Sequence, residues 1–231
     1  MTRQTYWKTA LTTAGVAIAF AIAGCTASNT SIAPIPQSPT SAGVKHMDTP
    51  TPTPTPIQLV IGGTIGTLHW PKGDTATGGQ GQQVAGLNCL KQLGEPFHHH
   101  VQLSFFVNGQ QLAMPFGVGM YLPGGGKSGY IYHQNCLYFV HTHDRTGIIH
   151  IESKVDQPYT LGMLFKLWGE PLSDTQIAEF TGPVSVYVNG TLDTTDPIQN
   201  VPLTGGSDIT LVIGQPPDWI PVYLLPPSLS P

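Results

Sequence analysis

Two β-rich runs that end in Asn-Gly constrain the fold of this chain more than any other feature of its sequence. Residues 101–114 read VQLSFFVNGQQLAM, and residues 184–190 read VSVYVNG. Asn-Gly is the preferred pair for two-residue turns between antiparallel strands, because both turn positions take positive φ. The other strand-like runs are IQLVIGG, CLYFVHTH, GIIHIES and DITLVIG. The sequence therefore predicts a mostly β protein built from antiparallel hairpins.

One helix is expected, from Thr160 to Gly169, so the fold class is α+β and mostly β. Thr160 can cap its first turn, and Gly169 followed by Pro171 ends it. The order hairpin, helix, hairpin, strand between Cys136 and Gly214 resembles a β-grasp arrangement, which implies no function by itself. The apolar side chains of the helix recur at helical spacing along one face: Leu161, Leu164, Phe165 and Trp168.

The first 24 residues have the pattern of a secretory signal. Arg3 and Lys8 precede the uncharged run TALTTAGVAIAFAIA, and small residues follow. The run is shorter than the roughly 20 residues that a membrane-spanning helix needs. Ile22 to Cys25 reads IAGC and resembles the lipobox of bacterial lipoproteins. The resemblance implies cleavage before Cys25, acylation of that cysteine, and a protein anchored in the lipid bilayer on the extracytoplasmic face of the cell envelope.

Residues 25–56 are predicted to form a lipidated stalk, and residues 57–231 a single β-rich outer domain. The stalk is rich in Ser, Thr and Pro and ends in TPTPTPTP, which favours extended polyproline II. Removal of residues 1–24 takes Arg3 and Lys8 from the nine basic residues, so seven remain against thirteen acidic ones. Because acidic residues outnumber basic ones, we expect no nucleic acid partner.

Cys89 and Cys136 are the only cysteines left to pair once Cys25 is acylated. An exported protein meets oxidising conditions, so we expect a disulfide between them. Ligation of a metal ion by these two thiols is the alternative.

Three histidines and a glutamate lie within HTHDRTGIIHIES, residues 141–153. Asp favours the start of a turn and Gly its end, so residues 144–147 read as a four-residue hairpin loop. If His143 then faces Ile148, His141 lies directly opposite His150. Strand alternation places six side chains on this face: Phe139, His141, His143, Ile148, His150 and Glu152. The opposite face is apolar and is expected to cover the core: Tyr138, Val140, Ile149 and Ile151.

A second histidine pair, His98 and His100, lies on the polar face of the strand before Asn108-Gly109, whereas His99 points with the apolar residues. The expected disulfide would bring this pair near the first. We therefore predict a transition-metal site, zinc or copper, made from some of His98, His100, His141, His143, His150 and Glu152. Two alternatives are a metal-free histidine cluster that changes charge with pH, and a plain solvated strand face.

The segments HHHVQLSFFVNG, HTHDRTGIIHIES and TLGMLFKLWG resemble an exported domain of bacteria and archaea to which no activity is assigned. The resemblance covers Cys89 to Gly169 and implies a shared site that includes all six of these histidine and glutamate residues. Gln102 departs from the pattern, which has a further histidine there.

Three functions remain open on the sequence. The first is a non-catalytic lipoprotein that binds, buffers or delivers a transition metal. The second is a metal-dependent enzyme, since the ligand set is similar to that of cupin oxygenases and Glu152 or Asp144 could serve a hydrolase as the base. The third is a module that binds another envelope protein through the apolar, proline-flanked tail at residues 216–231, although we expect the tail to pack across its own domain as an extended strand. Residues 124–129, GGGKSG, are expected to form a flexible turn.

Overall fold

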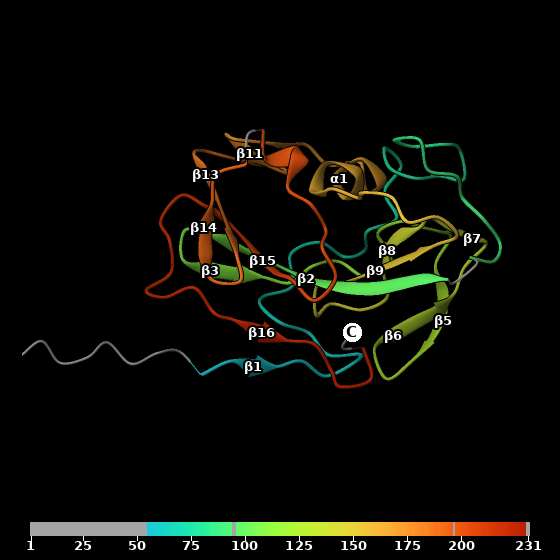
Figure 1. The fold of residues 1–231 in the computed structure, drawn as a ribbon, viewed down its shortest axis with the longest axis horizontal. Helices are drawn as coiled ribbons and strands as arrows, with labels where there is room; N and C mark the ends of the chain where they lie inside the picture. The colour runs from blue at the N-terminus through green and yellow to red at the C-terminus, as the bar shows by residue number, and fades with distance from the viewer. Residues whose placement is uncertain (1–54, 94–95, 196, 230–231) are drawn as a thin grey trace, which may run out of the picture. The chain divides into compact units, whose positions relative to one another are not determined.

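The hairpin at Asn108-Gly109 is present, as its sequence predicts. Asn108 and Gly109 have φ values of 49° and 79°, and the flanking strands pair Val107 with Gln110 and Phe105 with Leu112. The computed structural model describes residues 55–93, 96–195 and 197–229 (Figure 1). The predicted α+β, mostly β fold class is confirmed, because one α-helix accompanies strands that pair mostly antiparallel in this part of the chain.

The strands and helices, in chain order, are β1 (Ile57–Gln58), β2 (Phe97–Val107), β3 (Gln110–Leu112), β4 (Met120–Tyr121), β5 (Gly124–Lys127), β6 (Tyr130–His133), β7 (Cys136–Leu137), β8 (Val140–Thr142), β9 (Ile148–Ser153), α1 (Leu161–Trp168), β10 (Leu172–Ser173), β11 (Gln176–Ile177), β12 (Phe180–Thr181), β13 (Val184–Val188), β14 (Thr191–Asp193), the 3-10 turn η1 (Ile198–Asn200), β15 (Asp208–Ile213) and β16 (Tyr223–Leu224). The segment expected to be a flexible turn at residues 124–129 is instead the first half of the β5–β6 hairpin.

The main sheet has the strand order β14-β13-β15-β2-β9-β8, and β3 pairs with β2 beside it. The predicted order of hairpin, helix, hairpin and strand is present as β8–β9, α1, β13–β14 and β15. At the centre, β15 and β2 run parallel, and antiparallel pairs flank them on both sides. This arrangement resembles a β-grasp in which β2, from before Cys136, is a central strand. β2 is therefore long enough, at eleven residues, to pair both with the central strand β15 and with the histidine-bearing strand β9.

Helix α1 covers one face of the main sheet and forms the core with it (Figure 1). Leu161, Leu164, Phe165 and Trp168 are all buried, as their spacing predicts. Thr160 holds the N-cap position in an extended conformation but makes no side-chain capping hydrogen bond, so that detail of the prediction is wrong. Gly169 ends the helix with φ of 82°.

The other face of the sheet is also covered, by short strands and by the C-terminal tail (Figure 1). In the tail, β16 pairs in parallel with β1, and Tyr223 packs with Leu59 and Ile148 in a second, smaller core. The tail therefore packs back across its own domain, as expected. Most of the polar face of β2 and β9 is therefore buried between layers, whereas His98 at its end stays exposed.

The signal, Cys25 and most of the predicted stalk lie outside the described residues. Pro50–Pro231 form one compact unit. Within the described ranges, no helix has the length and apolar character required to cross a bilayer.

Candidate metal centre

The candidate site is a patch on one face of three neighbouring strands, β2, β9 and β8. His100 pairs with His150, and His150 pairs with His141, so three imidazoles form a row across the sheet. His98 pairs with Glu152 in the adjacent row. Directly opposed residues have Cβ atoms about 4.5–5.5 Å apart, so these side chains must meet on the shared face.

The hairpin register predicted from the four-residue loop is confirmed at its decisive pair, His141 opposite His150. His143 follows the end of β8 and forms no strand pair, yet its ring lies 4.6 Å from that of His150. The predicted role of the disulfide needs correction. Cys89 and Cys136 are bonded, with Cα atoms 5.4 Å apart, but His98 and His100 reach the site because β2 pairs directly with β9.

The rings of His141 and His143 are held by backbone carbonyls. His141 Nδ1 donates to the carbonyl oxygen of Tyr138 at 2.9 Å, and His143 Nδ1 donates to that of Ile131. A carbonyl oxygen only accepts, so each Nδ1 must carry the hydrogen. In the neutral rings the Nε2 atoms are then both acceptors, and they lie 3.0 Å apart. Two acceptors this close are unfavourable unless a proton or a metal ion lies between them.

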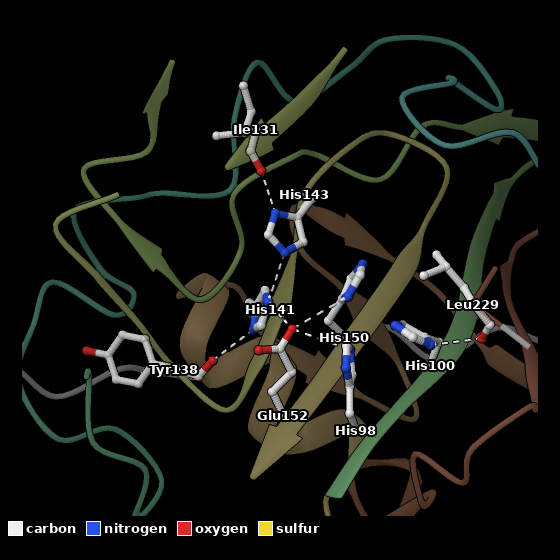
Figure 2. A network of polar contacts seen from close by, with 9 residues as sticks. All are labelled: His98, His100, Ile131, Tyr138, His141, His143, His150, Glu152 and Leu229. Carbon is white, nitrogen blue, oxygen red and sulfur yellow. Dashed lines mark hydrogen bonds and ion pairs between the residues drawn. The ribbon is translucent and has the colours of Figure 1, made fainter. Parts of the chain in front are cut away.

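Glu152 and His150 complete this group. Figure 2 shows the Glu152 carboxylate among three imidazoles. Its Oε1 lies 3.4 Å from His98 Nε2, 3.8 Å from His141 Nε2 and 3.9 Å from His150 Nδ1. Tetrahedral zinc with ligands at about 2.0–2.1 Å separates its donor atoms by about 3.3–3.4 Å. These three separations lie at or above that value, and the 3.0 Å between His141 Nε2 and His143 Nε2 lies below it, so small side-chain adjustments would admit an ion.

The structure brings the six predicted ligands into two overlapping groups. His141, His143, His150 and Glu152 each offer one ligand atom, and these atoms lie within 4.8 Å of one another. His98, His100 and His150 form a second group by the same measure. His99 points to the other face, where it lies against Gly205. Gln102 is fully buried in the next row and donates to the carbonyl of Thr146 at 3.2 Å.

Burial keeps these imidazoles neutral. Desolvation is the largest cause in each case, and neighbouring histidines add to it. It lowers the pKa of His100 and of His143 to about 4. It lowers the pKa of His141 and of His150 well below the ordinary 6.5. Neutral imidazole is the form that coordinates a metal, so the site is ready to bind at neutral pH without releasing protons from these rings.

Burial also decides between the alternatives for this strand face. His100, His141, His143 and His150 are between 0% and 9% exposed, so the solvated-face alternative is wrong. The cause is the second layer. Tyr130 of β6 stacks on His143 with ring centroids 4.4 Å apart, and the carbonyl of Leu229 accepts a hydrogen bond from His100 Nδ1 at 2.9 Å (Figure 2).

Sequence reasoning missed these covering residues. Tyr130 and Ile131 come from the β5–β6 hairpin, whose signal was Ser128-Gly129 between two short runs; both positions have positive φ. Leu229 lies on the tail, 129 residues from the histidine it orients, and no local pattern points to that contact.

No family model, no curated protein and no solved structure matches this chain. The resemblance to an exported bacterial and archaeal domain therefore stays a prediction.

A pocket of about 410 Å³ opens onto His141, His143 and Glu152. Such a volume is sufficient for a small ligand. Its other lining residues are mostly polar: Lys91, Gln92, Leu93, Gln134 and Leu137. The pocket gives solvent molecules or a small ligand a route to the imidazole nitrogens.

Asp144, the other candidate base, does not share the site. Its Oδ2 accepts from the backbone of Gly62 at 2.7 Å, and its Oδ1 accepts from the backbone and hydroxyl of Thr146. Asp144 therefore holds the loop between β8 and β9 in shape. Glu152 is the carboxylate that faces the histidines.

Proposed function

We propose that this protein is an extracytoplasmic, lipid-anchored lipoprotein whose outer domain binds a transition-metal ion at His141, His143, His150 and Glu152. The observation that carries the proposal is the pair of buried Nε2 atoms of His141 and His143, 3.0 Å apart, with both Nδ1 hydrogens committed to carbonyls. Such carbonyl contacts orient metal-ligating histidines and fix their tautomers. The structure supports a site that can hold a metal; the identity of the ion and the anchor are parts of the proposal.

Zinc and copper fit the donor set best. Imidazole suits Zn, Cu, Fe and Ni, whereas Mg and Ca prefer sites made wholly of oxygen ligands. Three imidazoles and one carboxylate give a four-coordinate set for zinc. Because the ligands come from paired strands that already share one face, the site is largely preformed, as a protein that binds or delivers an ion requires.

The first test measures metal content in the full-length chain, purified without a polyhistidine tag. After exposure to zinc or copper near pH 7 and removal of loose ions, elemental analysis should find metal retained. The double substitution His141→Ala/His150→Ala should abolish binding at this group, because it removes two ligand atoms. His133→Ala is the control, since His133 is exposed at the end of β6. Absence of binding at micromolar metal would support the metal-free histidine cluster instead.

The anchor has a separate test. Cys25→Ala should leave the precursor uncleaved before residue 25 and without fatty-acid label, whereas the unaltered chain should be labelled and recovered with membranes. Several acyl chains at about 0.8 kcal/mol per buried CH₂ give stable membrane attachment. Acylation of the Cys25→Ala variant would show that the lipobox interpretation is wrong.

A metal-dependent enzyme is the second candidate, and the pocket favours it. The pocket reaches His141, His143 and Glu152, so a bound ion could keep a position open to a substrate or water. The pocket walls are polar and not aromatic, which favours a small polar substrate. Cobalt-substituted protein titrated with azide distinguishes the cases: a shift of the visible bands indicates an open position, and unchanged bands indicate a closed binding site.

A further inference from the structure

We propose that the cluster holds two transition-metal ions side by side, with His98 and His100 binding the second ion and Glu152 shared between the two. The inference rests on the proposed function, because it keeps the first ion at His141, His143, His150 and Glu152. His150 also lies within reach of His98 and His100, but a neutral imidazole has one free lone pair and binds one ion. The first ion has four ligand atoms without His98 or His100, so these two histidines are left for the second.

His100 points to a second ion independently of the first group. His100 is 7% exposed, and its Nδ1–H donates a hydrogen bond to the carbonyl oxygen of Leu229 at 2.9 Å. Its Nε2 is therefore an acceptor in the neutral ring, and among the described residues this buried atom has no hydrogen-bond partner. A buried acceptor without a partner is unfavourable, and a metal ion would satisfy it.

The rings around His100 lie close enough for their nitrogen atoms to share one ion. His98 lies 4.6 Å from His100 and His150 lies 4.5 Å from it, between ring centroids, and the His100 and His150 planes are nearly perpendicular. Nitrogen atoms of all three rings lie within 4.8 Å of one another. His98 is the most exposed of the three, so it provides the entry side of this group.

One ion cannot use all the donors. Four ligand atoms at about 2.0–2.1 Å complete a tetrahedral shell, which leaves no position for two further imidazoles. Two ions about 3.5–4 Å apart are common in sites where a ligand is shared. Glu152 suits this role, because its Oε1 faces His98 on one side and His141 on the other. Glu152 supplies only one negative charge, so hydroxide or another anion from the pocket must balance the rest.

The test counts ions in the full-length chain by native mass spectrometry and elemental analysis, with zinc or copper as the probe. The unaltered chain should bind two equivalents. His98→Ala/His100→Gln should bind one, and His98→Ala alone, at an exposed position, should weaken the second equivalent at least tenfold. His99→Ala is the matched control, because His99 lies between them in β2 but faces the other side of the sheet; it should still bind two.

Copper gives a second measurement that does not depend on whether a variant folds. At two equivalents of Cu²⁺, neighbouring ions should couple, so the integrated electron paramagnetic resonance signal should fall below that of two isolated ions. Saturation at one equivalent, or two uncoupled ions, would overturn the two-ion proposal and leave the single site intact. Binding of no ion at all would overturn the proposed function and this inference together.

Discussion

For three of the four buried histidines, the nitrogen that faces a backbone carbonyl decides what the other nitrogen can bind. His100, His141 and His143 each donate Nδ1–H to a carbonyl, from Leu229, Tyr138 and Ile131. Their Nε2 atoms are therefore acceptors turned into the cluster (Figure 2). Three rings in the same tautomer are an expected feature of metal ligands, because a carbonyl partner both orients the ring and makes it a better donor.

The same burial predicts that the metal-free protein loses stability in mild acid. The pKa of His100 and His143 is about 4 in the folded chain and near 6.5 when unfolded. Between these values the unfolded chain binds protons that the folded chain does not, so stability falls as pH drops from 6.5 towards 4. For a buried group this amounts to on the order of 3 kcal/mol.

Urea unfolding with a chelator at pH 7.5, 6 and 5 measures this effect, with His100→Gln/His143→Gln as the comparison. Burial raises the pKa of Asp208 to about 6, which opposes the trend, because the folded chain takes up that proton first. The difference in pH dependence between the unaltered chain and this variant gives the contribution of His100 and His143, because Asp208 is present in both. Equal pH dependence in both would show that burial does not hold these rings neutral.

Among the elements, the loop between β8 and β9 controls how closely the histidine strands approach. Gly147 has φ of 80°, and its carbonyl accepts a hydrogen bond from the backbone of Leu103 at 2.9 Å. A Cβ added at Gly147 would lie 1.9 Å from the Leu103 carbonyl oxygen. Only glycine allows this loop to lie against β2, so the residue that ends the predicted turn also sets the position of β9.

Gly147→Ala should therefore destabilise the protein by at least about 2 kcal/mol and weaken metal binding. Part of the loss, about 1 kcal/mol, comes from the positive φ alone. Gly86→Ala is the matched control, because Gly86 also has φ of 80° but no atom lies within 4 Å of the added Cβ. Denaturant unfolding of both variants separates the backbone strain of positive φ from the steric clash with Leu103. Equal losses of unfolding free energy in the two variants would contradict the close approach of the loop to β2.

For the whole molecule, the disulfide supports the pocket rather than the ligands. Cys89 precedes Lys91 and Gln92, which line the pocket, and Cys136 precedes Leu137, which lines it too. The ligands themselves lie on β2, β8 and β9, whose pairing does not involve either cysteine. Stability and metal binding should thus depend on the disulfide to different degrees.

Cys89→Ser/Cys136→Ser should lower the free energy of unfolding by up to about 4 kcal/mol, the chain-entropy value for a loop of this length. Metal stoichiometry near neutral pH should be unchanged while the variant remains folded. Denaturant unfolding and elemental analysis of the same preparation check both outcomes. Loss of metal from a folded variant would mean that the disulfide, and not strand pairing, holds the ligands together.

Local pattern was sufficient for much of this fold. The Asn108-Gly109 hairpin, the apolar face of α1 and the opposition of His141 and His150 follow from alternation, helical spacing and turn length, and these depend only on neighbouring residues. The disulfide was predictable because no other pairing within the chain remained once Cys25 was assigned to the lipid.

Only the tertiary structure decided which strands meet at the histidine face and which segments cover it. A strand has two edges, and nothing in the β9 sequence shows that its second edge pairs with β2, which brings His98 and His100 to the cluster. The β9 sequence also does not show which segments cover this face. The β5–β6 hairpin and the tail lie over that face and bury four of its histidines, and Leu229 reaches His100 across 129 residues. An alternating polar face looks the same in sequence whether water or a second layer covers it, because burial depends on distant segments.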